Sequence, residues 1–311
     1  MSIRPQVRCV YDACCTFDPR SANHVYCTEH KCRRRSENEG KRLHSEALFE
    51  QPREFKTEKV SRAPNGTRIM IVNDLQRPFQ DDATLEGVEK FWEDFAPHYE
   101  VYAGDVADLY TISTFDKNPS RRFKLFDECK DTKQWLVSHA EANPSAKRIW
   151  IDGNHEDRMR RWLWKYGEEM SSLPELDIRY QLGITEVGAT YLSYMSVFDF
   201  LGYRIEHGFK TSASKAYPIN VSRFMAIATG SSGLCGHTHH FSNYAWTDSR
   251  GSHSYIENGC LCRMDLEFAP FPNWQHAFTY GVVHNNKVHL HGVQIYPDGF
   301  RANGEFYPRR G

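Results

Sequence analysis

Residues of types that commonly bind metal ions stand at the ends of five runs of the sequence, each typical of a buried β-strand. In chain order they are Asp74 and Gln76 after 67–73, Asp105 and Asp108 after 99–104, Asn154 and His155 after 147–152, His207 within 203–208, and His237 and His239 at the end of 232–237. In open α/β sheets, ligands bind beyond the carboxyl ends of the strands, so we expect these side chains to share one crevice. Carboxylate, imidazole and amide ligands together suit two borderline divalent ions such as Mn, Fe, Zn or Ni. The pattern therefore predicts a hydrolytic centre with two ions about 3.5–4 Å apart and one carboxylate between them.

Each of these residues also has a simpler explanation. An aspartate at a strand end is usually a turn or cap residue, and Gly153-Asn154-His155 could be a turn with a capping asparagine. The run GHTHH, 236–240, could be a patch of surface histidines. These explanations would have to hold at five places in one fixed order, so a single metal site is the favoured interpretation. The nearby glycines fit it, because a chain that turns tightly around an ion needs φ values that other residues resist.

The elements that must position these residues alternate between strand and helix patterns. Helices are expected over 82–95, where Pro97 ends the pattern, over 120–142, and after His155. Further strands are expected at 254–259, 278–283 and 287–293. This alternation predicts an α/β sandwich with a more purely β second half. We predict three segments: a Cys-rich module at 1–35, a charged linker or helix at 36–63, and the main domain at 64–311, after the turn signal at 63–66.

The motifs GDVAD (104–108), GNHE (153–156) and GHTH (236–239), in this order, resemble the calcineurin-like metallophosphoesterase superfamily. The resemblance covers about residues 67–295, and the wider context resembles members encoded by bacteriophages and prophages. It implies a four-layer α-β-β-α sandwich that hydrolyses phosphate esters, with Mn as the first choice for two catalytic ions and Fe, Zn or Ni as alternatives.

The resemblance also implies a role for each residue. Asp74 and His239 would hold the first metal, Asn154, His207 and His237 the second, and Asp105 would bridge both. His155 would contact the substrate phosphate and protonate the leaving oxygen, while Asp108 would orient His155. A metal-bound hydroxide would attack the phosphorus.

Gln76 stands where most of the superfamily places a second histidine for the first metal. An amide oxygen is a harder and weaker donor than imidazole for borderline ions. We therefore expect a labile first metal rather than a dead enzyme.

The segment after Asp108 bears on the substrate. Protein phosphatases of the superfamily read G-D-x-x-D-R-G, whereas Leu109 follows Asp108 here. This difference argues against a phosphoprotein phosphatase. Arg158 and Arg161 interleave with Trp162, a combination that suits phosphate contact and base stacking. A helix with aromatic core positions and a solvated basic face explains the same pattern.

Five of the nine cysteines fall within the first 32 residues. Their two groups, about a dozen residues apart, predict a structural zinc site in a segment too short for a core of its own. The preferred ligands are Cys9, Cys14, Cys27 and Cys32, with Cys15 and His30 as substitutes. A reduced Cys-rich tail is the alternative. The remaining cysteines, Cys129, Cys235, Cys260 and Cys262, are expected to be buried structural thiols.

Composition limits the classes of function. The net charge is −1, with 40% hydrophobic and 25% charged residues, as in ordinary globular proteins. No apolar run has the length of a membrane span, and the first residues lack a signal-peptide core. We expect a cytoplasmic protein, in the host cytoplasm if phage-encoded, without a membrane partner. The predicted activity is hydrolysis of phosphodiesters in nucleic acid or nucleotides; the alternatives are a catalytically weakened nucleic-acid-binding or interaction scaffold, and a phosphomonoesterase.

Overall fold

The computed structural model describes residues 55–118, 120–121, 124–208, 221–266 and 272–309, together with 7–8 and 16–17. The chain divides into two compact units, Met1–Glu54 and Phe55–Gly311. In the first unit, β1 (Val7–Arg8) pairs antiparallel with β2 (Thr16–Phe17). The zinc ligands expected in this unit, Cys9, Cys14, Cys27 and Cys32, lie outside the described residues, so the zinc module stays a prediction.

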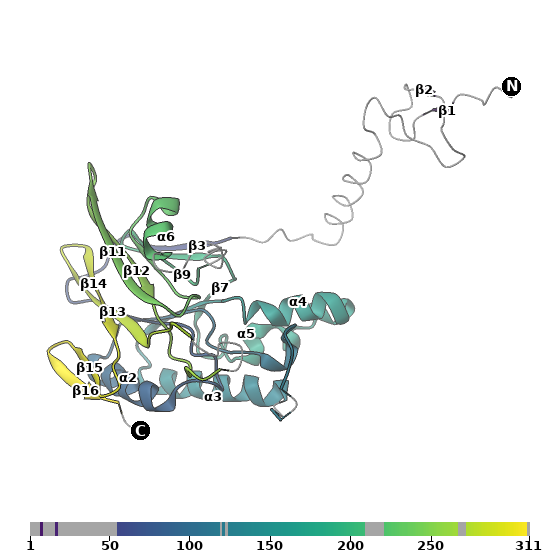
Figure 1. Cartoon of the computed structure of the whole chain (residues 1–311), viewed down its shortest axis with the longest axis horizontal. Coiled ribbons are helices and arrows are strands. Elements are labelled where there is room, and N and C mark those ends of the chain that lie inside the picture. Colours follow the sequence, from purple (N-terminus) through teal and green to yellow (C-terminus); the bar gives the residue numbers. More distant parts are fainter. Residues whose placement is uncertain are drawn as a thin grey trace. The chain divides into compact units, whose positions relative to one another are not determined.

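Two six-stranded mixed sheets form the second unit (Figure 1). The first sheet has the order β14-β13-β4-β5-β6-β7, and the second has the order β11-β12-β10-β9-β8-β3. The strands of the first sheet are β4 (Arg68–Val72), β5 (Tyr99–Ala103), β6 (Lys147–Ile151), β7 (Thr190–Leu192), β13 (Ala277–His284) and β14 (Lys287–Gln294). The strands of the second are β3 (Thr57–Val60), β8 (Val197–Phe200), β9 (Tyr203–Glu206), β10 (Gly233–Cys235), β11 (Phe241–Asp248) and β12 (Gly251–Asn258).

Side chains that alternate along the central strands explain why the sheets stack. Ile69 and Ile71 of β4 belong to the core between the two sheets, whereas Met70 and Val72 belong to the core under the helices. Helices α2 (Asp82–Phe95) and α3 (Leu125–Ala142) cover the first sheet, and α6 (Val221–Thr229) packs on the second (Figure 1). The four-layer α-β-β-α sandwich expected from the sequence is therefore confirmed.

The helix boundaries follow local signals. The Asp81 carboxylate caps α2 by accepting from Thr84 N–H at 2.8 Å, and the helix ends at Phe95, just before Pro97, as expected. Helix α3 begins at Leu125 rather than at 120, where Asn118 Oδ1 accepts from Ser120 N–H in a turn. The shorter and later elements are η1 (Tyr110–Ile112), α4 (Asp157–Tyr166), η2 (Glu168–Ser172), η3 (Pro174–Leu176), α5 (Ile178–Gln181), and the hairpin of β15 (Gly299–Ala302) and β16 (Glu305–Pro308).

Strand β3 lies within the stretch expected to be a linker. It pairs in parallel with β8 at the edge of the second sheet, so the compact unit begins at Phe55 rather than at 64. Three of its four side chains are exposed, and an edge strand tolerates such charged residues. This strand could therefore not be predicted from its polar sequence.

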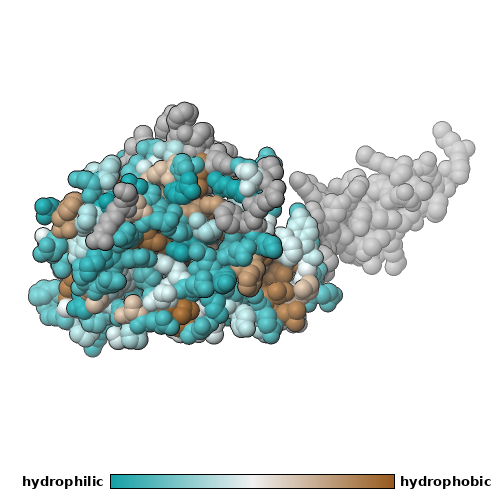
Figure 2. Space-filling view, turned by 90° about the horizontal axis from the view of Figure 1, so that it is seen from below, coloured by the Kyte–Doolittle hydropathy of each residue, from teal (hydrophilic) through white to brown (hydrophobic). Residues whose placement is uncertain are grey.

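Within the described part of the chain, no helix has both the length and the apolar character needed to cross a bilayer. On the face shown in Figure 2, hydrophobic side chains form small patches separated by hydrophilic ones.

Candidate active site

Five strand ends meet between the two sheets. Strands β4, β5 and β6 run parallel in the first sheet, and β9 and β10 run parallel in the second, so the loops that follow them gather at one edge. The loops approach each other very closely. A Cβ placed on Gly104 would lie 2.5 Å from His207 Nδ1, and one on Gly236 would lie 2.6 Å from Asp74 Oδ2. These two glycines allow the loops of different sheets to touch.

The residues expected to bind metal adopt an unusual backbone conformation themselves. The φ angles are 52° for Asp74, 51° for Gln76, 51° for Asp105, 74° for His237 and 61° for His239. This left-handed region is uncommon for residues other than glycine and costs about 1–3 kcal/mol per residue. From the sequence, the tight turns were expected at glycines. Gly104, with a φ of 89°, fits this expectation. Strain concentrated in this way is characteristic of functional sites.

One group of ligand-type atoms surrounds Asp105. Atoms of Asp105, His207 and His237 lie within 4.8 Å of one another, and His207 Nε2 is 3.2 Å from both Asp105 Oδ2 and Asn154 Oδ1. His207 Nδ1 lies 3.0 Å from the Ala103 carbonyl and can only donate there, which leaves the Nε2 lone pair for an ion. His237 Nδ1 is buried without a hydrogen-bond partner. These atoms fit a divalent ion.

A second group lies at the end of β4. His239 Nε2 is 3.2 Å from Asp74 Oδ1 and 3.1 Å from Gln76 Nε2. Asp74 Oδ1 and Gln76 Oε1 are buried without a hydrogen-bond partner, although the Asp74 atom lies within ion-pair distance of His239. Rotation of the Gln76 amide by 180° would bring Oε1 toward His239 Nε2, where it could share an ion with the imidazole. Orphaned oxygens beside an imidazole nitrogen fit a second ion.

The electrostatics of the two groups favour the binding of cations. Burial opposes the charged form of His207, but Asp105 raises its pKa to about 10. Burial likewise opposes the charged form of His239, but Asp74 raises its pKa to about 9. Burial and the nearby His207 lower the pKa of His237 to about 4, so this imidazole is neutral and available as a ligand. The buried carboxylates attract protons to the histidines, and they would attract divalent cations in the same way.

Asp105 belongs to the first group and also acts electrostatically on the second. Burial disfavours its charge, yet His155 and His207 hold the pKa of this carboxyl well below its usual range. Its charge also acts on Asp74, where it raises the pKa against the stronger lowering effect of His239. The location is the one expected for a carboxylate shared by two ions.

His155 lies beside this centre, in contact with Arg158. Arg158 Nη2 donates to His155 Nε2 at 2.8 Å, and Arg158 Nη1 donates to Asp108 Oδ1 at 2.8 Å. Asp108 Oδ1 lies 3.4 Å from His155 Nδ1, which has no hydrogen-bond partner. The expected Asp108–His155 proximity is therefore present, but the hydrogen bonds of Asp108 go to Arg158. Arg161 is more peripheral: it donates to the Asn154 carbonyl at 3.1 Å and pairs with Asp157.

Glu156, which completes the GNHE motif, has a structural role that was not predicted from the sequence. Its fully buried carboxylate accepts three backbone N–H groups, from Asp105 at 2.9 Å, Ala107 at 2.9 Å and Gly153 at 2.8 Å. It therefore joins the loop of Asp105 to the loop of Asn154 and His155. An acidic residue directly after the predicted ligands was the only available signal.

Glu156→Gln should destabilise the protein by about 1–3 kcal/mol, because an amide offers one acceptor oxygen where the carboxylate offers two and leaves buried N–H groups unpaired. Thermal unfolding measures the loss. Glu169→Gln, at an exposed position of η2, is the matched control and should change stability by less than about 0.5 kcal/mol. Equal stability of the two variants would show that Glu156 does not hold the loops.

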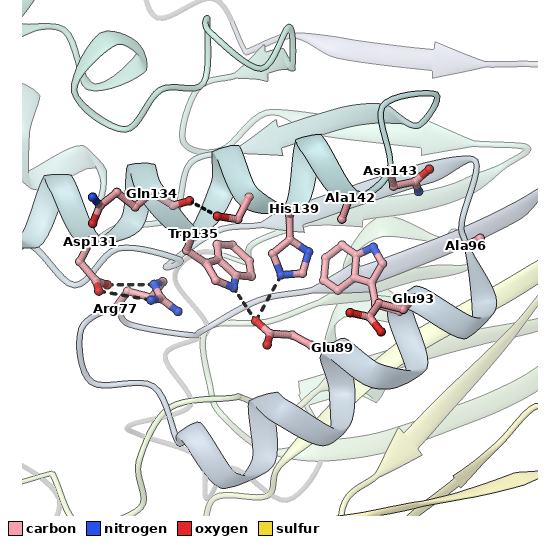
Figure 3. A pocket seen from close by; sticks show the side chains of 12 residues that line it. Arg77, Glu89, Glu93, Ala96, Asp131, Gln134, Trp135, His139, Ala142 and Asn143 are labelled. Carbon is pink, nitrogen blue, oxygen red and sulfur yellow. Dashed lines mark hydrogen bonds and ion pairs between the residues drawn. The ribbon is translucent and has the colours of Figure 1, made fainter.

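A separate cavity of about 600 Å³ lies between α2 and α3 (Figure 3). Its charged residues already have charged partners. Arg77 pairs with Asp131 at 2.9 Å, and Glu89 accepts from Trp135 Nε1 at 2.8 Å and lies 3.2 Å from His139 Nε2. None of the expected metal ligands lines this cavity, so the chemistry belongs to the strand ends.

Comparison with known proteins gives weak similarities. No family model matches the chain. The Gene 54 protein of Mycobacterium phage D29 is 26% identical over 260 residues, which cover 77% of this chain and 98% of that protein. Vacuolar Protein Sorting 29 from Cryptosporidium parvum aligns with a TM-score of 0.42 at 11% identity, covering 79% of this chain and 100% of the other. A dimetal phosphatase from Danio rerio aligns with a TM-score of 0.38 at 12% identity, over 79% and 100% of the two chains.

Proposed function

We propose that the chain is a dinuclear metal-dependent phosphoesterase. The observation that carries the proposal is the convergence of Asp105, His207 and His237 within 4.8 Å, beside a second group with orphaned Asp74 and Gln76 oxygens. Asp74, Gln76 and His239 would hold one ion, Asn154, His207 and His237 the other, and Asp105 both. Two divalent ions held in this way polarise a phosphate and lower the pKa of a water molecule. Mn is our first choice, with Fe, Zn or Ni as alternatives.

His155 and Arg158 would act on the substrate from one side of the centre. In the described arrangement, Arg158 donates to His155 Nε2, so that nitrogen carries the lone pair and the proton resides on Nδ1, toward Asp108. A substrate phosphate would draw the Arg158 guanidinium away from the ring, since arginine binds phosphate oxygens more strongly than it binds imidazole. His155 Nε2 would then take up a proton from solvent, giving an imidazolium whose charge Asp108 stabilises, and would pass that proton to the leaving oxygen.

We propose that the substrate is a phosphodiester in nucleic acid. Helix α4 begins directly after the GNHE motif and presents Trp162, 39% exposed, and Tyr166, 63% exposed. Their rings are 5.5 Å apart, and Lys165 Nζ lies 4.9 Å from the Tyr166 ring centroid. Exposed aromatic rings with adjacent cations are suited to stacking single-stranded bases beside a phosphate. A strand with one phosphate at His155 could extend along this helix.

Trp162→Ala and Tyr166→Ala should each weaken binding of single-stranded DNA or RNA by roughly 5–150-fold, because base–aromatic stacking contributes about 1–3 kcal/mol per base. Hydrolysis of bis-p-nitrophenyl phosphate, which has no bases, should change little. Tyr296→Ala, at a 55% exposed position outside α4, is the control. Fluorescence anisotropy measures binding. Unchanged affinity in both α4 variants would remove the helix from the substrate path.

Gln76→His should lower the Mn concentration needed for half-maximal activity, because imidazole binds borderline ions better than an amide oxygen does. In the native chain the first ion should dissociate before the second and be lost on mild chelation. An activity titration against free Mn, run on both proteins, measures the shift. Coincident curves would mean that Gln76 does not contact the ion.

The weaker ligand at Gln76 also supports a second candidate function, a nucleic-acid-binding or interaction scaffold with reduced catalysis. A scaffold has no need of a proton donor, and the His155–Arg158–Asp108 cluster therefore favours the enzyme. A phosphomonoesterase is the third candidate. Assaying the protein with Mn against bis-p-nitrophenyl phosphate, p-nitrophenyl phosphate, DNA and RNA separates the three: no turnover of any substrate would contradict the enzyme.

The similarity to a mycobacteriophage protein supports a phage or prophage origin, for which the host cytoplasm is the proposed location. The N-terminal zinc module, with one structural Zn²⁺ on Cys9, Cys14, Cys27 and Cys32, remains part of the proposal.

A further inference from the structure

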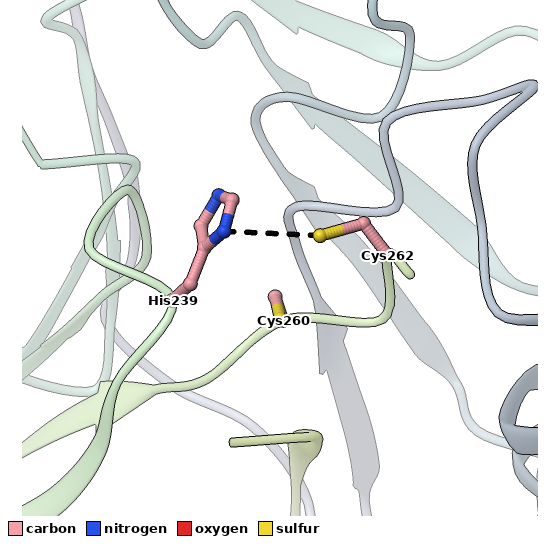
Figure 4. Close-up of side chains that lie close together, drawn as sticks. All are labelled: His239, Cys260 and Cys262. Carbon is pink, nitrogen blue, oxygen red and sulfur yellow. Dashed lines mark hydrogen bonds between the residues drawn. The ribbon is translucent and has the colours of Figure 1, made fainter. Parts of the chain in front are cut away.

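Two buried thiols lie on the far side of the His239 ring from the proposed catalytic ions. Cys260 and Cys262 are both free and have no solvent exposure. Ligand-type atoms of His239, Cys260 and Cys262 all lie within 4.8 Å of one another (Figure 4). His239 Nε2 is the nitrogen near Asp74 and Gln76, whereas Nδ1 lies 3.7 Å from Cys262 Sγ. The two nitrogens of one ring therefore face two different sets of ligands.

The spacing of His239 Nδ1 and Cys262 Sγ suits a tetrahedral ion, and Cys260 lies near enough to supply a further ligand. With Zn–S bonds of about 2.3 Å and Zn–N bonds of about 2.0–2.1 Å, neighbouring N and S ligands lie about 3.5 Å apart and two S ligands about 3.8 Å apart. The observed 3.7 Å between Nδ1 and Sγ is close to this value. The Cys260 thiol makes a weak hydrogen bond to the Gln275 carbonyl at 3.8 Å, which an ion could replace.

The surroundings of the thiols select a soft ion over a hard one. Cys260 and Cys262 belong to an apolar cluster with Phe79 and Leu266, and the Trp274 ring packs edge-on against His239 with centroids 4.3 Å apart. An apolar site accepts a metal complex only if the ligands cancel its charge. Two thiolates and one neutral imidazole cancel the charge of a divalent ion. Thiolates also favour thiophilic ions, whereas Asp74 and Asp105 suit harder ones.

We propose that His239, Cys260 and Cys262 form a binding site for a thiophilic divalent ion of the Zn²⁺ class, which competes with the first catalytic ion for His239. A neutral imidazole has one lone pair. When Nδ1 binds the thiophilic ion, the ring proton moves to Nε2, which becomes a donor toward Asp74 and can no longer bind an ion. The two thiol protons are released to solvent. The competition rests on the proposed function, whereas binding at the thiols does not.

The test uses the full chain with Cys9, Cys14, Cys15, Cys27 and Cys32 replaced by serine, so that the Cys-rich head contributes no thiolate. Cd²⁺ is the probe, and its ultraviolet sulfur-to-metal charge-transfer band is the readout. One equivalent of Cd²⁺ should produce the band, and adding Cys260→Ser with Cys262→Ser should abolish it. Cys129→Ser and Cys235→Ser, which replace buried thiols outside the cluster, should leave it intact. Thermal unfolding of each variant verifies that it folds.

No band in the head-substituted protein, or a band that survives loss of both Cys260 and Cys262, would overturn the site. Competition between Cd²⁺ and Mn²⁺ for His239 is measured separately, from the free Mn²⁺ signal in electron paramagnetic resonance. Cd²⁺ should release one bound Mn²⁺, and the variant without the two thiols should need at least roughly tenfold more Cd²⁺ for the same release, since thiolates bind such ions more tightly than carboxylates do. If both proteins need the same Cd²⁺ concentration to release Mn²⁺, the thiols do not compete for the ion and only hydrogen-bond to His239. A protein that binds no Mn²⁺ but shows the band would contradict the proposed function alone.

Discussion

Asp105→Ala should remove both catalytic ions and reduce phosphodiester hydrolysis by more than about a thousandfold, since bound metal ions supply several kcal/mol of transition-state stabilisation. Asp105 is the carboxylate nearest His207, at 3.2 Å, and its charge reaches Asp74 as well. Without it, the histidines of both groups would lose their shared counter-charge. Metal content by mass spectrometry and kcat under excess Mn are the measurements.

The control is Asp265→Ala. This carboxylate is exposed and pairs with Arg263 at 2.6 Å, so its loss should leave metal content and kcat unchanged. An Asp105→Ala protein that retains two ions would show that Asp105 does not lie between them.

His155→Ala should lower kcat by about 10²–10⁴-fold while both ions stay bound, because a general acid contributes that much and the ring lies outside the two ligand groups. Its ring contacts Arg158 at 2.8 Å and lies 3.4 Å from Asp108, whereas ring Nε2 is 3.6 Å from Asp105 Oδ2. Steady-state kinetics with metal analysis of the same sample separates the two effects.

His289→Ala, at an exposed position of β14, is the matched histidine control and should be neutral. Loss of metal from the His155 variant, to the same extent as from the Asp105 variant, would reassign His155 as a ligand.

The sequence predicted the parts of the site that depend on strand order. Apolar runs ending in Asp74, Asp105, Asn154, His207 and His237 were sufficient to place five loops at one edge, because the carboxyl ends of parallel strands meet there. The alternation of strand and helix patterns predicted an α/β sandwich, and the helix pattern before Pro97 predicted α2 with its end at Phe95.

Other features depend on contacts between distant segments and had no local signal. Glu156 is informative only once the loop of Asp105 lies against it, some 50 residues earlier in the chain. Cys262 and His239 are 23 residues apart and meet because β12 carries the chain back beside β10. Strand β3 has an exposed, charged sequence that resembles a linker until β8 pairs with it. The left-handed backbone of the ligands is likewise imposed by the assembled loops.

The central claim is that two ions share Asp105. The most direct measurement is a crystal structure of the protein loaded with excess Mn, with the ions located by anomalous scattering. We expect two anomalous peaks within about 4 Å of each other. One ion should lie among Asp74, Gln76 and His239, and the other among Asn154, His207 and His237. Both ions should contact the Asp105 carboxylate. A map without an ion at Asp105, or with a single ion that contacts only one of the two groups, would contradict the claim.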